Sequence, residues 1–187
     1  MKFPMHRVST VAIAIASLLT VPVHAADTFQ IADAEVVVVC PLTVGGSFEA
    51  RTREVAGDIT PPIDKKGPVG GTLRVNLQKL ETGIALRDRH MKNNYLEVER
   101  GTDFATATLS GIEVETLEGK AAFRGVLALH GQTKPVSGFA EVHFRDGRYR
   151  IEAQFSLRVS DYQIPTPSYL SIGVRDEIKV KVRFTAA

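Results

Sequence analysis

The sequence has a single cysteine, Cys40, and no tryptophan among its 187 residues. One cysteine cannot form a disulfide within the chain or supply a cysteine cluster for a metal ion. We expect Cys40 to be a small buried hydrophobic side chain at the end of a strand. An unpaired thiol also permits an intermolecular bridge, so a homodimer stays an open alternative.

The sequence also lacks an apolar run of membrane-spanning length, since its N-terminal run, residues 11–20, is about half of the roughly 20 residues required. Lys2 and Arg7 precede this run, and Val23-His24-Ala25 provides small residues at a cleavage position. We therefore predict a signal peptide over residues 1–25, cut between Ala25 and Ala26. Residues 26–187 would then form one periplasmic or secreted domain without a stable membrane anchor.

No excess of basic charge remains once that segment is removed, because 21 basic residues then balance 21 acidic ones. A clustered basic surface is the first sign of a nucleic-acid-binding protein, so nucleic acid is not an expected partner. The usual nucleophile-elbow, phosphate-loop and dinucleotide motifs are absent too. His90, His130 and His143 lack the spacing of metal ligands, which favours ordinary surface or hydrogen-bonding roles. The sequence predicts no enzyme, no catalytic residue, no metal and no cofactor.

Strict alternation of apolar and polar residues is the strongest positive signal, and it is clearest over residues 148–159. Gly119 and Gly147 sit between alternating runs, as tight antiparallel turns require. The predicted strands cover residues 28–40, 46–60, 69–79, 104–115, 118–130, 133–145, 148–159 and 173–185. We predict an all-β, eight-stranded antiparallel barrel, since closure hides one face and removes the edges; a two-sheet sandwich is the alternative.

Two segments depart from this alternation. In residues 80–98, Ile84, Met91 and Tyr95 recur at helical spacings, which predicts a short helical insert between the third and fourth strands. Residues 160–172 are rich in proline and tyrosine and are expected to form an ordered loop near a barrel mouth.

The predicted inner face carries no charge, so any ligand inside the barrel must be apolar along most of its length. Eight strands are also few enough for side chains to fill a barrel, and both outcomes stay open at this point. Gly125 and Gly138, which fall in strand positions, are expected to leave unfilled volume.

Four stretches carry a resemblance to a known family: LETGIALRDRHMKNNYLEV, GVLALHGQTKPVSGFAEV, SDYQIP and VRDEIKVKV. Together they resemble the YceI-like family of secreted lipid-binding barrels. The resemblance implies a lipocalin-like barrel whose lumen takes a long isoprenoid or similar amphiphile, with the insert covering or lining the opening. This chain departs from the family at Tyr95-Leu96, where a Phe-Phe pair is usual.

From the residues and the resemblance together, we predict a protein that binds a polyisoprenoid, an isoprenoid quinone or a similar long-chain lipid for transport or storage. A cofactor-free enzyme or a protein-interaction module on a filled barrel is the alternative. Arg87 and His90 are candidate headgroup contacts, although Asp88 could instead cap or pair within a solvated cluster. The predicted ligand-binding residues are Leu73, Val75, Leu77, Met91, Tyr95, Leu96, Leu109, Phe123, Leu127, Leu129, Phe155 and Val180.

Overall fold

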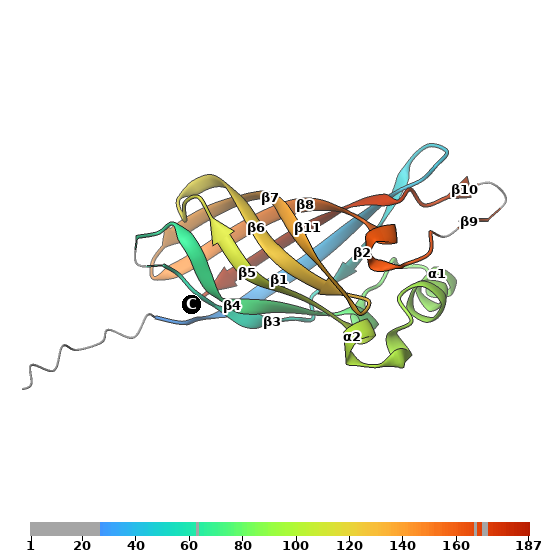
Figure 1. Ribbon diagram of the computed structural model, residues 1–187, viewed down its shortest axis with the longest axis horizontal. Helices are drawn as coiled ribbons and strands as arrows, with labels where there is room; N and C mark the ends of the chain where they lie inside the picture. The colour runs from blue at the N-terminus through green and yellow to red at the C-terminus, as the bar shows by residue number, and fades with distance from the viewer. Residues whose placement is uncertain (1–26, 63, 167, 170–171) are drawn as a thin grey trace, which may run out of the picture.

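The protein folds into one closed antiparallel β-barrel with a helical insert at one end (Figure 1). The computed structural model describes residues 27–62, 64–166, 168–169 and 172–187, so the predicted signal peptide lies outside it. The barrel strands are β1 (Phe29–Pro41), β2 (Ser47–Thr52), β3 (Val55–Thr60), β4 (Gly67–Asn76), β5 (Thr106–Val114), β6 (Gly119–Leu129), β7 (Gln132–Arg145), β8 (Arg148–Arg158) and β11 (Glu177–Ala186).

Strand pairing runs in chain order from β3 to β8, continues from β8 to β11, and closes where β11 pairs with β1. Both β2 and β3 pair with β1, so they are two halves of one barrel strand, and the predicted eight-stranded barrel is confirmed. The prediction of one unbroken strand over residues 46–60 was wrong. The Thr52 hydroxyl accepts a hydrogen bond from the Glu54 amide at 3.1 Å, which turns the chain at this point.

Two hairpin turns have two residues each, with both in the left-handed conformation that matches the strand twist. Asp146 and Gly147 join β7 to β8 at φ of 52° and 74°. His130 and Gly131 join β6 to β7 at φ of 52° and 71°, where the sequence had suggested a longer connection over residues 130–135. Because β7 begins at Gln132, Pro135 lies within a strand.

The end of the barrel that holds the first residue of β1 is closed by packed side chains, and we call it the base. Tyr149 is buried there, with the Phe29 ring edge-on to it at 5.2 Å and the Phe144 ring tilted against it at 4.5 Å between centroids. Ile59 and Leu117 are also buried at this end. These aromatic and aliphatic side chains therefore close the base of the barrel. The insert lies at the opposite end.

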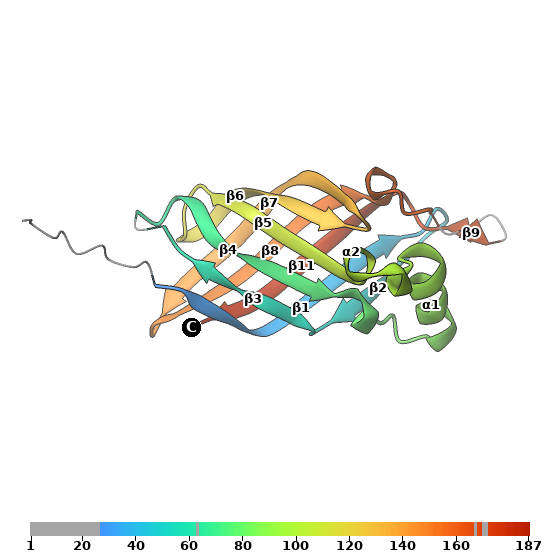
Figure 2. The same ribbon diagram turned by 60° about the horizontal axis from the view of Figure 1, so that its bottom comes forward.

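The insert, residues 77–105, joins β4 to β5 and lies at the opposite end, which we call the mouth (Figures 1 and 2). It consists of η1 (Leu77–Lys79), α1 (Ala85–His90), the π-helical turn η2 (Met91–Tyr95), η3 (Val98–Arg100) and α2 (Thr102–Ala105). The predicted strand over residues 69–79 therefore ends three residues early, at Asn76, whose side chain accepts from the Gln78 amide at 3.0 Å. None of the helices in the described residues is long and apolar enough to cross a membrane.

Asp88 joins α1 to the segment just before it. Its Oδ1 accepts hydrogen bonds from the Thr82 amide at 2.7 Å and from the Thr82 hydroxyl at 2.6 Å. The segment that follows β8 also lies at the mouth, where it forms η4 (Val159–Tyr162) and, outside the barrel, the short pair β9 (Ser168–Tyr169) and β10 (Ile172–Gly173). The mouth is thus bordered by the insert on one side and by this segment on another.

Gly138 lies on the inner face of β7, paired with Phe123 of β6 and Phe155 of β8. The sequence suggested that its missing side chain would leave unfilled volume, but the backbone of β8 takes that space. A Cβ atom built at Gly138 would lie 2.1 Å from the Gln154 carbonyl oxygen and 2.8 Å from the Phe155 Cβ. Glycine is therefore required here by the close approach of two strands.

Replacing Gly138 by alanine should lower the free energy of unfolding by about 3 kcal/mol, because the β7 and β8 backbones must separate to admit a methyl group. Thermal unfolding followed by circular dichroism measures this loss. Ser137→Ala, at the exposed neighbouring position of the same strand, is the matched control and should unfold at nearly the wild-type temperature. Equal melting temperatures for the two variants would contradict the close contact.

Candidate ligand-binding site

A cavity of about 970 Å³ occupies the barrel interior and reaches the insert at the mouth. Its size is at the upper end of the range for small-molecule sites. The barrel is therefore not filled by its own side chains. All fourteen residues singled out from the sequence line it: Leu73, Val75, Leu77, Arg87, His90, Met91, Tyr95, Leu96, Leu109, Phe123, Leu127, Leu129, Phe155 and Val180. Their contact with a ligand stays a prediction.

The wall of the cavity is apolar throughout its depth. Phe123 and Phe155 meet edge-on with ring centroids 6.2 Å apart, and small side chains at Ala107, Ala140 and Ala153 leave the space beside them open. Every residue that the barrel strands contribute to the lining is hydrophobic or small, apart from the Cys40 thiol. Water in such a space has few hydrogen-bonding partners, so an apolar occupant is favoured over water.

Sequence reasoning missed the contribution of β1, whose Val36, Val38 and Cys40 line the cavity. Their alternation is hidden in the sequence, because Val37 and Val39 are apolar as well and face outward. It also missed Ile164 and Pro165, which line the cavity from the segment after η4. The segment predicted as a loop over residues 160–172 borders the mouth through these two residues, but it includes most of η4, all of β9 and the start of β10, and residues 167, 170 and 171 lie outside the described part of the chain.

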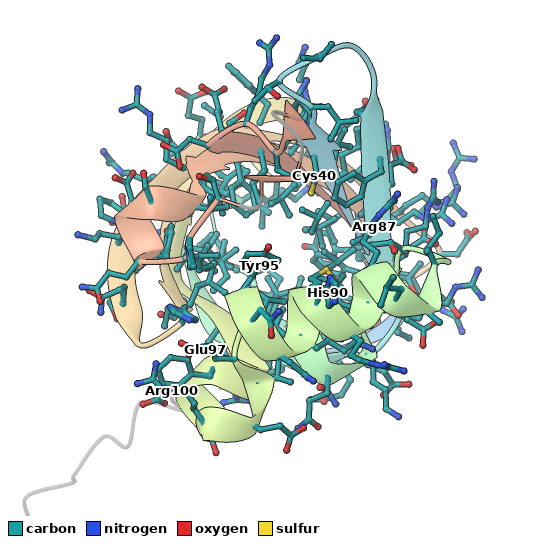
Figure 3. All side chains as sticks on the ribbon, turned by 90° about the vertical axis from the view of Figure 1, so that its right-hand side faces the viewer. Cys40, Arg87, His90, Tyr95, Glu97 and Arg100 are labelled. Carbon is teal, nitrogen blue, oxygen red and sulfur yellow. The ribbon has the colours of Figure 1, made fainter. Side chains whose placement is uncertain are left out.

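Polar lining groups gather at the mouth, where Cys40, Arg87, His90 and Tyr95 surround the opening (Figure 3). The Arg87 guanidinium lies over the Phe48 ring, with its carbon 4.3 Å from the ring centroid. This cation–π contact holds the side chain against the rim and keeps its charge at the cavity entrance. Arg87 forms no ion pair with any residue that the structure describes.

His130 is buried, so of the two roles that the sequence favoured it has the hydrogen-bonding one and not the surface one. Its Nδ1 donates to the Tyr162 carbonyl oxygen at 2.9 Å, since a carbonyl oxygen can only accept, and the Phe104 ring lies edge-on at 4.7 Å. Its Nε2 lies 3.2 Å from a Glu97 carboxylate oxygen without the alignment of a hydrogen bond. A hydrogen bond from Arg100 holds the pKa of Glu97 below its usual value. His130, in the β6–β7 turn, thus contacts both the insert, through Glu97, and η4, through Tyr162.

Cys40 is half-buried and lines the cavity near its mouth, as Figure 3 shows. Burial raises the pKa of its thiol to about 11, and the nearby charge of Arg87 opposes this rise only in part. A thiol of this kind stays protonated at neutral pH and is a poor nucleophile, which disfavours an intermolecular bridge. Within the described residues, no three histidine, cysteine, aspartate or glutamate side chains are placed to hold a metal ion.

Alkylation of Cys40 by iodoacetamide at pH 8 should be roughly a hundredfold slower in the folded protein than in urea, because the pKa rises from 9.0 to about 11 and the thiolate fraction falls accordingly. The rate in the folded protein should increase about tenfold per pH unit up to about pH 11. Mass spectrometry of timed samples gives both rates. Equal rates in the folded and unfolded protein would contradict the burial of the thiol.

The overall shape of the chain is similar to solved bacterial structures. Burkholderia cenocepacia BcnA matches with a TM-score of 0.68 at 14% identity, over 82% of this chain and 96% of that one. A polyisoprenoid-binding domain from Saccharophagus degradans matches at 0.60 and 15% identity, over 85% and 97%. The Campylobacter jejuni YceI protein matches at 0.55 and 15% identity, over 75% and 85%. At these identities the likeness concerns the fold.

A search of curated proteins finds no match. The family model described as the YceI-like domain matches residues 20–186, which is nearly the whole chain. The chain therefore belongs to the YceI-like family.

Proposed function

We propose that the protein binds the tail of a long-chain lipid, namely a polyisoprenoid, an isoprenoid quinone or a similar amphiphile, inside the barrel for transport or storage. The observation that carries the proposal is a cavity of about 970 Å³ whose wall is uncharged and whose polar groups lie at one end. That distribution suits a molecule with an apolar chain and a polar head. The polyisoprenoid-binding domain from Saccharophagus degradans, which shares the fold, supports the ligand class.

Met91, Tyr95 and Leu96 are proposed to touch the ligand where it enters. All three line the cavity from the insert, and Tyr95 and Leu96 also pack against the hydrophobic core. A methionine side chain adapts to differently shaped apolar partners, and a tyrosine combines an apolar ring with a polar tip. The insert therefore offers the entering chain an apolar inner side while its ends stay anchored.

The proposed function includes export of the protein from the cytoplasm. We infer that residues 1–25 direct the chain to the periplasm or the exterior, on the strength of their basic head, apolar run and small residues before Ala26. An aqueous compartment next to a membrane is where a long apolar molecule needs a carrier. Binding is proposed because the described residues that line the cavity below the mouth are apolar and suit a long apolar molecule.

Affinity should rise with tail length until the cavity is full, because each buried methylene contributes about 0.8 kcal/mol before the costs of ordering the chain. Titrating isoprenoid alcohols of increasing length against the purified protein, with tyrosine fluorescence or calorimetry as readout, measures the trend. Leu127→Trp, which adds bulk inside the cavity, should shorten the longest tail that still gains affinity.

Val126→Trp is the matched control, since Val126 is the neighbouring residue on the outer face of β6 and does not line the cavity. It should leave the length dependence unchanged. Two results would contradict a binding site inside the barrel: an affinity that does not depend on tail length, or an equal effect of Leu127→Trp and Val126→Trp on that dependence.

Arg87 and His90 are proposed to contact the headgroup. Arg87 presents a guanidinium at the entrance, where it can donate to a phosphate or carboxylate in a fork geometry. The neighbouring acidic residue, Asp88, forms no ion pair with Arg87, and its Oδ1 accepts two hydrogen bonds from Thr82. The cavity thus has a cation at its rim and none below it.

Arg87→Gln should weaken binding of an isoprenoid phosphate by about tenfold or more, because a hydrogen bond between charged groups is lost. Binding of the alcohol with the same tail should change little. Arg89→Gln, which removes the same charge from an exposed residue outside the cavity lining, is the control. Equal losses for phosphate and alcohol would contradict a headgroup role for Arg87.

A further inference from the structure

The rim of the mouth exposes large apolar side chains on two separate elements. Val44, in the turn between β1 and β2, is 64% exposed, and Ile84 and Leu86, at the start of α1, are 50% and 60% exposed. The β1–β2 hairpin and α1 project from the same end of the barrel in both ribbon views (Figures 1 and 2). Ile84 and Leu86 also line the cavity, so the exposed apolar surface continues into the interior.

The same rim carries cations without ionic partners. Arg87 and Arg89 lie on α1, and the Arg175 Nε donates to the Leu42 carbonyl oxygen at 3.0 Å, beside the hairpin that holds Val44. None of the three arginines forms an ion pair with a residue that the structure describes.

The nearby carboxylates Asp88 and Asp176 stay charged but form no ion pair with these arginines. The Asp88 side chain accepts from Thr82, and Asp176 accepts from the Ser160 amide at 2.9 Å and from its hydroxyl at 2.7 Å, which lowers the pKa of Asp176. Glu49 pairs with Arg51.

The side of the mouth near η4 differs from this rim. There, Lys134 and Arg158 lie around one small pocket together with Asp161 and Glu177, so basic and acidic groups are balanced. Arginines without ion-pair partners among the described residues and exposed apolar side chains therefore coincide on the part of the rim formed by the β1–β2 hairpin and α1. We call this part the docking rim, defined by Val44, Ile84, Leu86, Arg87, Arg89 and Arg175.

We propose that the docking rim binds the surface of an anionic lipid bilayer and points the cavity mouth at the membrane. Its three apolar side chains enter the interface, and its three arginines meet lipid phosphates. Each cation near such a surface contributes about 1 kcal/mol, and a few exposed apolar side chains add a modest amount, so binding is reversible. A long apolar ligand then passes between bilayer and cavity without crossing water.

The transfer of a ligand between bilayer and cavity rests on the proposed function. Binding of the docking rim to a bilayer requires no isoprenoid and is tested without one. The exported chain is mixed with phosphatidylcholine vesicles that contain or lack phosphatidylglycerol, free of any isoprenoid, and bound protein is measured by flotation. The protein should float with the anionic vesicles, stay behind with the neutral ones, and detach as salt is raised. No flotation, or equal flotation with both vesicles, would overturn the proposal.

Two pairs of variants test which face binds. Arg89→Gln with Arg175→Gln should weaken binding to anionic vesicles roughly thirtyfold, because each cation contributes about fivefold and the two factors multiply. Arg145→Gln with Arg148→Gln removes two exposed cations from the base and should have no effect. Val44→Ser with Leu86→Ser should likewise weaken binding, whereas Phe139→Ser, 54% exposed on the outer barrel wall, should not.

Equal losses in the rim and control variants would overturn the docking rim, provided that all variants keep the wild-type melting temperature. Sedimentation equilibrium adds an independent test. A dimer that Val44→Ser with Leu86→Ser dissociates, without vesicle binding by the wild type, would show that this face joins two copies of the chain and would overturn the lipid assignment. Titration of an isoprenoid in solution reports on the cavity separately, so failure of docking and failure of ligand binding are distinguishable.

Discussion

The pairing of β1 with β11 is the contact on which the rest of the structure depends, because it converts a sheet into a closed barrel. Its register places Val36 opposite Val182 and Val38 opposite Val180, and all four side chains line the cavity. Lys179 and Lys181, the alternate residues of β11, consequently face water. A slip of one residue would turn both lysines into the lumen, and the cost of burying unpaired charges opposes that slip. The register between β1 and β11 therefore determines which side chains of these two strands face the cavity and which face water.

The difference between a filled barrel and a hollow one lies in the size and position of the inward side chains. At the base, the Phe29 ring packs edge-on against the buried Tyr149, and the half-exposed Phe144 ring packs against it at a tilt. Higher up, Ala140 and Ala153 face each other across β7 and β8, and both line the cavity. Because side chains of this size cannot meet across an eight-stranded barrel, the volume above the base stays open to a guest. Large residues thus close one end, and small residues keep the middle empty.

Strand number, barrel closure and the inward positions could be predicted from the sequence because alternation is a local property that the pleat converts directly into two faces. The structure could not be predicted where the alternation of apolar and polar residues was hidden or interrupted. In β1 the run from Val36 to Val39 is apolar on both faces, so its cavity-lining residues went unnoticed. At the break between β2 and β3 the Thr52 hydroxyl accepts a hydrogen bond from the Glu54 amide, which no sequence period reveals. The burial of His130 depends on Glu97 and Tyr162, which are distant in sequence and meet only after the barrel closes.

The insert, residues 77–105, interrupts the strand pattern and lies over the mouth, with polar contacts on either side of an apolar stretch. Asp88 accepts hydrogen bonds from Thr82 before this stretch, and Glu97, next to His130, contacts the β6–β7 turn after it. Between these two polar anchors lies the π-helical turn that carries Met91 and Tyr95 into the cavity lining, and such turns are frequent at functional sites. Thr82, Asp88, Glu97 and His130 do not line the cavity, so the contacts that anchor the insert are separate from the cavity-lining positions of Met91 and Tyr95.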